Sequence, residues 1–317
     1  MAVRDVRERI EPGTLAVLDQ LTKWDLTSVQ TIRSSYGVGR PSPVREGVER
    51  EDAEVGGVRV RWYRPAGAAS RGPLPCLLWL HGGAYIMGNL DENDDRLDRM
   101  VLATGLAICS VDWRLAPEHP WPAGLEDAEA VYGALLADPT SYSVDGGRLV
   151  VGGASAGAGL AAALCLRVRE KGGRQPALQL LIYPMLDDRE VTDSIRAAED
   201  PGHWGLWHLR ANRLCWEAYL SGLSGLAGDH DVPPTAAPAR ATDLAGLAPA
   251  FVGVGDIDAF VDEDVDYAMR LSRAGVPTEL HVYPGVIHGG FGAEPRTPRT
   301  AQLLEDVYAA LERVAVS

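Results

Sequence analysis

A serine among small residues is the first candidate for chemistry. Residues 153–157 read Gly-Ala-Ser-Ala-Gly, with the apolar run 148–152 just upstream and an Ala- and Leu-rich stretch downstream. This order predicts a strand that enters a helix through a tight turn, with the Ser155 hydroxyl exposed at its apex. Small neighbours suit such a turn because its backbone is strained. Ser155 is therefore a candidate nucleophile, although the motif alone also fits a Gly-rich phosphate-binding loop.

A second loop of small residues could stabilise the negative charge that acyl transfer creates. The apolar run 76–80 predicts a buried strand, and Gly82, Gly83 and Ala84 follow it closely. Backbone N–H groups of Gly83 and Ala84 could point at a substrate oxygen, while Gly82 lets the loop turn. The amide of Ala156 would add a further donor. A plain turn is the alternative, but a loop about 70 residues before a serine elbow is the order expected of a serine hydrolase.

A nucleophilic serine also needs a base and an acid, which in this type of fold follow it in the order acid, then histidine. Among the five histidines after Ser155, His288 is favoured because it follows the strand-like run 279–283 in a Gly-rich loop. The acid should follow the run 250–254. The candidates there are Asp256, Asp258, Asp262, Glu263 and Asp264. Residues from 262 onward would also suit the first turn of a helix, because acidic groups favour its positive end.

Six blocks of sequence between residues 81 and 291 resemble, in the same order, the bacterial hormone-sensitive-lipase-like esterases of the α/β-hydrolase fold. The blocks are His81-Gly82-Gly83-Ala84-Tyr85, residues 111–120, the serine elbow, Ile182-Tyr183-Pro184, residues 255–263 and residues 282–289. The resemblance implies carboxylic ester hydrolysis with Asp258 as the acid and His288 as the base. It implies neither a metal nor an organic cofactor.

The chain departs from the family's usual pattern at three places. Ala84 stands where a third glycine is usual, and Ala154 where Asp or Thr is usual. Ala259-Phe260 replaces the usual Pro-Leu after Asp258. The two alanines are small enough to keep the expected geometry.

Three charged residues of the block 111–120 also stand out by resemblance. They are Asp112, Arg114 and Glu118. They precede Ser155, so the chain order excludes them from a triad. We expect them to form a buried polar network that holds the loop beside the candidate oxyanion hole.

Composition limits the partners and the compartment. The chain has 317 residues, a net charge of −14 and a pI near 4.9, which argues against nucleic acid and against an anionic membrane surface. Residues 1–9 mix both charge signs without an apolar stretch, so we expect them not to act as a secretory signal. The sequence has no run of about 18 apolar residues, so we expect no membrane span. Four widely spaced cysteines predict buried free thiols and a cytoplasmic location, with no metal-type Cys/His spacing. The expected partner is a small-molecule ester, and a homodimer is left open.

Short apolar runs alternate with helical segments from residue 74 onward, which predicts βαβ units and an α/β fold with a mainly parallel sheet flanked by helices. We expect residues 1–45 and 186–225 to form a helical cap, and 46–185 and 226–317 to form the catalytic core. Four bulky residues of the cap could line a pocket or simply pack helices together. They are Trp204, Trp207, Trp216 and Tyr219.

The sequence therefore predicts hydrolysis of short-to-medium acyl esters through Ser155, His288 and Asp258. Two alternatives remain at this stage. The same residues could cleave amides or carbonates. Some proteins of this fold are instead non-catalytic small-molecule receptors that have lost the histidine, and the presence of both Ser155 and His288 argues against that alternative.

Overall fold

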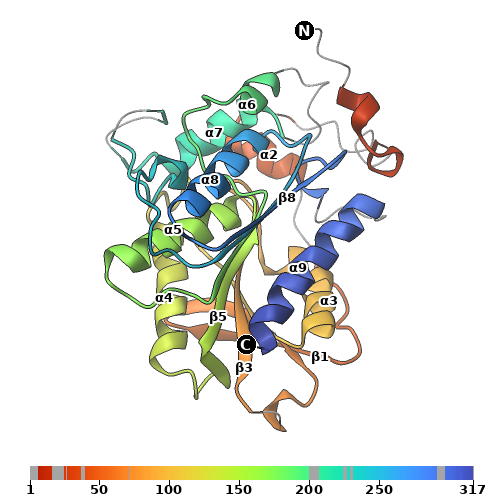
Figure 1. Ribbon diagram of the computed structural model, residues 1–317, viewed down its shortest axis with the longest axis vertical. Helices are drawn as coiled ribbons and strands as arrows, with labels where there is room; N and C mark the ends of the chain where they lie inside the picture. Colours follow the sequence, from red (N-terminus) through yellow and green to blue (C-terminus); the bar gives the residue numbers. More distant parts are fainter. Residues whose placement is uncertain are drawn as a thin grey trace.

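An eight-stranded sheet runs through the centre of the molecule (Figure 1). The computed structural model describes residues 6–15, 25, 27–36, 40–70, 72–199, 207–223, 227–228, 231–290 and 297–316. The strands lie in the order β1-β2-β4-β3-β5-β6-β7-β8. Their bounds are β1 Val48–Val55, β2 Val58–Pro65, β3 Leu74–Leu80, β4 Ala107–Val111, β5 Val144–Ala154, β6 Leu178–Ile182, β7 Ala250–Gly255 and β8 Thr278–Tyr283.

The predicted, mainly parallel sheet is confirmed. Strands β3 to β8 pair in parallel, whereas β2 pairs antiparallel with both β1 and β4. Gly56 and Gly57 join β1 to β2 with φ angles of 61° and 80°, which a tight hairpin turn requires. The parallel arrangement brings the carboxyl ends of β3, β5, β7 and β8 to one edge of the sheet, where the loops after them can meet.

Helices cover both faces of the sheet. Their bounds are α2 Val29–Tyr36, α3 Asp94–Thr104, α4 Ala123–Ala137, α5 Ala156–Glu170, α6 Asp193–Ala197, α7 Leu209–Tyr219, α8 Val261–Arg273 and α9 Pro298–Val316. Short 3-10 turns occupy Val6–Arg9, Ala68–Ser70, Leu90–Asn93 and Pro238–Arg240. Helices α4, α5 and α8 share one hydrophobic cluster with the sheet, and α3 and α9 share the other.

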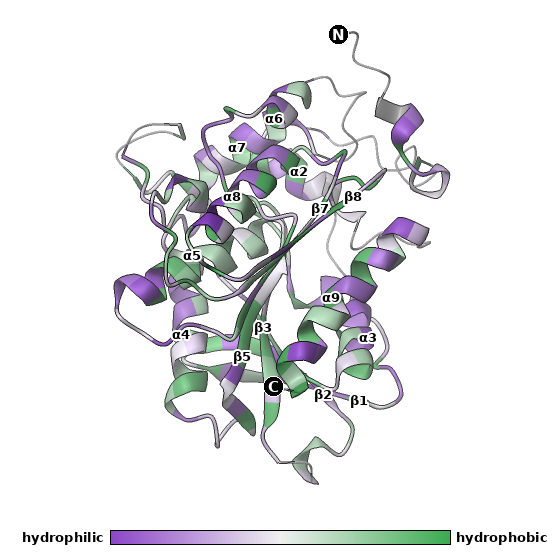
Figure 2. Ribbon diagram, viewed as in Figure 1, coloured by the Kyte–Doolittle hydropathy of each residue, from purple (hydrophilic) through white to green (hydrophobic). Residues whose placement is uncertain are grey.

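The strand period of two explains these two clusters. On β3, Cys76, Leu78 and Leu80 belong to the cluster with α4 and α5, while Leu77 and Trp79 belong to the cluster with α3 and α9. All five side chains are buried, as a strand covered on both faces requires. Figure 2 shows the same pattern, with hydrophobic residues along the central strands and hydrophilic residues on the peripheral helices.

Helices α2, α6 and α7 lie together at one end of the molecule (Figure 1). Helix α2 contacts α7, and α6 contacts α8. Part of the predicted N-terminal helices, including Leu18 and Leu21, lies outside the described residues, as does Trp204. The division into cap and core stays a prediction.

Two further sequence predictions concern the whole chain. The four cysteines are free and buried, as predicted. Within the parts of the chain that the structure describes, no helix has the length and apolar character needed to cross a membrane.

Candidate active site

Ser155 occupies a sharp turn between β5 and α5, as the sequence predicts. Its φ of 56° and ψ of −122° are strained for a residue with a side chain. A Cβ atom at Gly153 or Gly157 would lie 2.3 or 2.0 Å from the carbonyl oxygen of Leu80, so only glycine fits on either side. The strained backbone thus lies at Ser155, between the end of the buried strand β5 and the start of α5.

Three predicted residues from separate loops meet at this turn. The Ser155 Oγ lies 3.0 Å from Nε2 of His288, and Nδ1 of His288 lies 2.9 Å from Oδ2 and 3.1 Å from Oδ1 of Asp258. A tautomer with its hydrogen on Nδ1 donates to Asp258 and leaves Nε2 to accept from the serine hydroxyl. Asp258 is fully buried, and Ser155 and His288 are only 8% and 7% exposed. This geometry allows proton transfer from serine to imidazole.

The other candidate acids point elsewhere. Asp256 accepts a 2.6 Å hydrogen bond from the Gly285 amide and pairs with Arg9. Asp262 accepts from the Ser194 amide at 2.8 Å. Glu263 accepts from the backbone of residues 186 and 187, and Asp264 is buried without a hydrogen-bond partner among the described residues. Asp258 is thus the member of this acidic group that contacts His288.

Two of the other histidines after Ser155 have structural partners. His281 lies on β8, bonds to Glu279 and stacks on Phe251. His208 precedes α7 and accepts a hydrogen bond from the Arg210 amide. His203 and His230 lie outside the described residues.

Aromatic rings surround the His288 imidazole. Its ring centroid lies 4.9 Å from that of Tyr183, 4.9 Å from that of Phe260 and 5.8 Å from that of Trp207. Trp207 is 4% exposed and donates from its indole nitrogen to Asn212. These rings narrow the space around the imidazole.

The Gly82–Ala84 loop lies directly beside the serine. A Cβ atom at Gly82 would come within 3.5 Å of the Ser155 Cβ. Gly83 has a φ of 116°, and Ala84, at a φ of 54°, is a non-glycine residue in the left-handed region. Within the described chain, the amides of Gly83, Ala84 and Ala156 donate to no protein acceptor. All three N–H groups are thus free to bind a substrate oxygen.

Two aromatic residues and a histidine hold this loop. His81 is fully buried, bonds through Nδ1 to the Gly82 carbonyl at 2.7 Å and stacks on Trp113. Burial lowers the pKa of His81, so its ring is neutral and Nδ1–H is the donor. Tyr85 stacks on Tyr219 of α7, with ring centroids 3.9 Å apart.

The aromatic residues of the predicted cap have different neighbours. Trp216 and Tyr219 are buried against Tyr85, so they pack α7 onto the loop beside the serine. Trp207 instead packs against the rings of Phe260 and His288. Only Trp207 of these three therefore adjoins the residues that could do chemistry.

The prediction of one buried network at Asp112, Arg114 and Glu118 is wrong. Their side chains are 32%, 45% and 57% exposed, and each has its own partner. Asp112 pairs with Arg59 of β2, and Arg114 pairs with Asp127, a buried residue of α4. The three side chains form separate pairs because each reaches a different neighbouring element.

Glu118 nevertheless contributes to the loop beside the serine. Arg33 of α2 binds both Glu118 oxygens at 2.7 Å and donates to the carbonyl of Ala116 at 2.6 Å. Arg33 also donates to the carbonyl of Ile86, two residues after the Gly82–Ala84 loop. No sequence pattern indicates this role of Arg33, because its partners lie more than 50 residues away.

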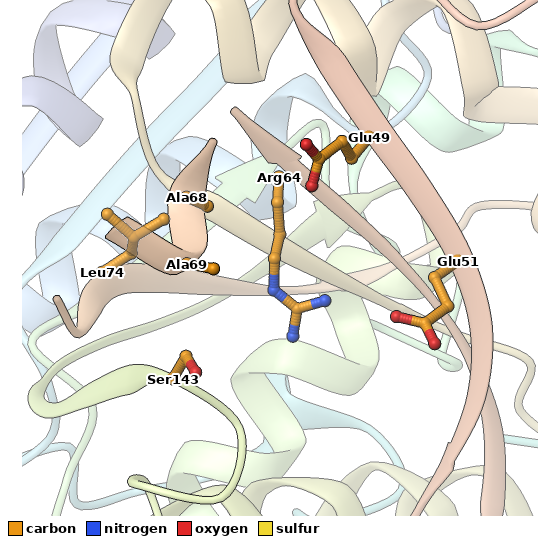
Figure 3. Close-up of a pocket in the computed structure, with 7 residues that line it drawn as sticks. All are labelled: Glu49, Glu51, Arg64, Ala68, Ala69, Leu74 and Ser143. Carbon is orange, nitrogen blue, oxygen red and sulfur yellow. The ribbon is translucent and has the colours of Figure 1, made fainter. Parts of the chain in front are cut away.

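A small pocket lies near the amino-terminal ends of β3 and β5, away from Ser155. It has a volume of about 170 Å³ and is lined by Glu49, Glu51, Arg64, Ala68, Ala69, Leu74 and Ser143 (Figure 3). Leu74 begins β3 and Ser143 precedes β5, whereas the Gly82–Ala84 loop and Ser155 follow the other ends of the same strands. This pocket is therefore separate from the candidate active site. No group of three or more potential metal ligands gathers anywhere in the described residues.

Known proteins resemble this chain in both sequence and fold. A sequence model of the alpha/beta hydrolase fold matches residues 77–292. Esterase LipI of Mycobacterium tuberculosis is 33% identical over 264 residues, which cover 83% of this chain and 80% of that protein. Carboxylesterase NlhH of the same organism is 32% identical and covers 81% and 78%. The solved structure of a bacterial heroin esterase superposes with a TM-score of 0.90 at 33% identity, covering 98% of this chain and 99% of that one.

Proposed function

The chain belongs to the hormone-sensitive-lipase-like family of the α/β-hydrolase fold and is a carboxylesterase, and from this premise we propose that it cleaves short-to-medium acyl esters through a Ser155–His288–Asp258 triad. One observation carries the assignment of the triad. A continuous line of hydrogen bonds runs from the Ser155 hydroxyl through both His288 nitrogens to the buried Asp258 carboxylate.

In the first half of the reaction, Ser155 Oγ attacks the ester carbonyl carbon while its proton passes to Nε2 of His288. Asp258 orients the imidazole and balances the charge that the imidazolium gains. The amides of Gly83, Ala84 and Ala156 donate to the oxyanion of the tetrahedral intermediate. When that intermediate collapses, the bond to the alcohol oxygen breaks, and the alcohol leaves with the proton from Nε2. An acyl-serine remains.

In the second half, a water molecule replaces the alcohol. His288 takes one proton from the water as its oxygen attacks the acyl carbon. The same three amides bind the second oxyanion. The Ser155 Oγ then leaves, accepts the proton from Nε2, and the carboxylic acid is released. No cofactor is needed for this balance.

The aromatic surroundings support a limited acyl length. Each methylene that finds apolar space adds about 0.8 kcal/mol of binding. Phe260, Trp207 and Tyr183 fill space around the imidazole with buried, packed rings. Displacing packed side chains costs about 1–3 kcal/mol, so longer chains gain little. We therefore expect acyl chains of roughly two to eight carbons to be preferred. In that range the binding free energy gained from added methylenes still exceeds the cost of displacing the packed rings.

A nitrophenyl ester series tests the proposed substrate range. We expect kcat/KM to be highest within about two to eight acyl carbons and low at sixteen. A maximum at sixteen or eighteen carbons, or strong activation by an oil interface, would contradict it. Matched anilides and carbonates test amide and carbonate hydrolysis, which the same residues could perform.

The four free, buried cysteines also support a cytoplasmic location.

A further inference from the structure

Glu263 connects two segments that meet behind the triad. It is 3% exposed, and its Oε1 accepts hydrogen bonds from the amides of Leu186 at 2.9 Å and Asp187 at 3.3 Å. Glu263 stands in the first turn of α8, which begins at Val261, just after the Asp258 loop. Its side chain therefore ties the loop of the acid to the chain that follows β6.

That chain, residues 183–187, touches the other parts of the site. The ring of Tyr183 packs edge-on against His288. The Met185 amide donates to the Ser155 carbonyl at 3.1 Å. The Met185 carbonyl accepts from the Tyr85 hydroxyl at 2.9 Å, and Tyr85 follows directly after Ala84. One short segment thus supports the serine turn, the oxyanion loop and the imidazole.

The helix dipole does not account for this arrangement. An acidic residue in a first turn is stabilised by the dipole while its side chain stays in water. Glu263 is instead buried, and its burial and the nearby Asp187 raise the pKa of its carboxyl well above the usual range. Burying a carboxyl group costs free energy unless the group is hydrogen-bonded. Both hydrogen bonds of Glu263 come from the 183–187 segment.

We propose that Glu263 is a positioning residue of the esterase, which holds residues 183–187 in register with the Asp258 loop and so keeps serine, oxyanion loop and imidazole aligned. The inference rests on the proposed triad. Removing the acceptor leaves two buried amides unpaired, and the segment must shift to find new partners. A misplacement on the order of 1 Å at a catalytic group can cost about 100-fold in rate.

Three variants of Glu263 separate positioning from general damage. Glu263→Ala is expected to lower kcat by about 10- to 100-fold while KM changes less than about threefold. Glu263→Gln keeps an acceptor oxygen in the same place and is expected to restore kcat to within about threefold of the parent. Asp266→Ala removes an exposed carboxylate from the same helix and serves as the matched control.

Active sites are counted with a fluorophosphonate before kcat is calculated, because a merely structural role would lower the number of sites and leave the rate per site unchanged. Parental kcat per site in Glu263→Ala, or equal losses in the Ala and Gln variants, would overturn the proposal. If the Ala variant does not fold, Glu263→Asp withdraws the carboxylate by one methylene. It should lower kcat, and parental kcat there would also overturn the proposal.

A double-mutant cycle with Tyr85→Phe tests the shared segment. Tyr85 binds the Met185 carbonyl, and Glu263 binds the next two amides of the same segment, so the two losses in kcat should not multiply. Losses that multiply fully would show two independent routes and contradict the role of residues 183–187. Failure of the triad itself would give a different result, because the parent protein would then carry no fluorophosphonate on Ser155.

Discussion

Gly82 and Ser155 are in direct contact, so that a Cβ atom at Gly82 would lie 3.5 Å from the Ser155 Cβ and 3.0 Å from the carbonyl oxygen of Ala154. A side chain at residue 82 would press on the Ala154 carbonyl, which belongs to the backbone of the serine turn and would have to shift by a few tenths of an ångström. In the proposed mechanism, the amides that follow Gly82 lie where a substrate oxygen develops negative charge.

We predict that Gly82→Ala lowers kcat by about 100-fold, the cost expected when an oxyanion-hole donor is displaced. Gly133→Ala is the matched control, because Gly133 lies on α4 with open space around it. The control should keep its activity and gain about 0.5–1 kcal/mol of stability. Steady-state kinetics and thermal unfolding of both variants provide the measurement. Unchanged kcat in Gly82→Ala would contradict the placement of the oxyanion hole.

We predict that Asp258→Asn lowers kcat by about 10³- to 10⁴-fold, because an amide favours the wrong imidazole tautomer and cannot balance the imidazolium charge. Asp256→Asn should cost little, since an amide oxygen can still accept from Gly285. The same holds for Asp262→Asn and the Ser194 amide. Rates per active site for the three variants decide the matter. If Asp256→Asn were the inactive one, the acid assignment would be wrong.

The parallel strands could be predicted from the sequence because a strand that is buried on both faces of the sheet reads as a continuous apolar run. The predicted run 76–80 lies within β3, Leu74–Leu80, and the run 250–254 lies within β7, Ala250–Gly255. The strand β1, Val48–Val55, lacks such an apolar run. Its sequence is highly charged, since it lies at the sheet edge with several side chains in water.

The supporting contacts of the site could not be predicted in the same way. Ser155, Asp258 and His288 follow strand-like runs, so their meeting follows from the parallel sheet. The contacts of Arg33 with Ile86 and of Glu263 with Leu186 join segments that are distant in sequence. The helix dipole alone would explain an acidic residue in the first turn of α8. The sequence therefore does not predict the contact of Glu263 with residues 186 and 187.

Asp264 gives a prediction about stability and pH. It is fully buried without a hydrogen-bond partner in the described residues, and burial raises the pKa of its carboxyl well above the usual range. The folded protein therefore holds this proton more tightly than the unfolded chain. Its contribution is most favourable below the ordinary carboxyl pKa and is lost progressively as pH rises towards the raised value.

We predict that Asp264→Leu raises the free energy of unfolding by about 1–3 kcal/mol near pH 7, because it replaces an unpaired buried carboxyl with an apolar group of the same branched shape. The gain should shrink towards about pH 3, below the ordinary carboxyl pKa, where Asp264 is protonated in both the folded and the unfolded protein. Urea unfolding of both proteins at several pH values measures the difference. A gain that grows as the pH falls would contradict the assigned direction.

The identity of the nucleophile is tested most directly by fluorophosphonate labelling followed by peptide mass spectrometry. We predict one adduct per chain, on Ser155, with none in Ser155→Ala and much slower labelling in His288→Ala, since the histidine activates the serine hydroxyl. Hydrolysis of a short-chain nitrophenyl ester should fall by at least about 10³-fold in Ser155→Ala. An adduct on another residue, or undiminished labelling and turnover in Ser155→Ala, would contradict the mechanism.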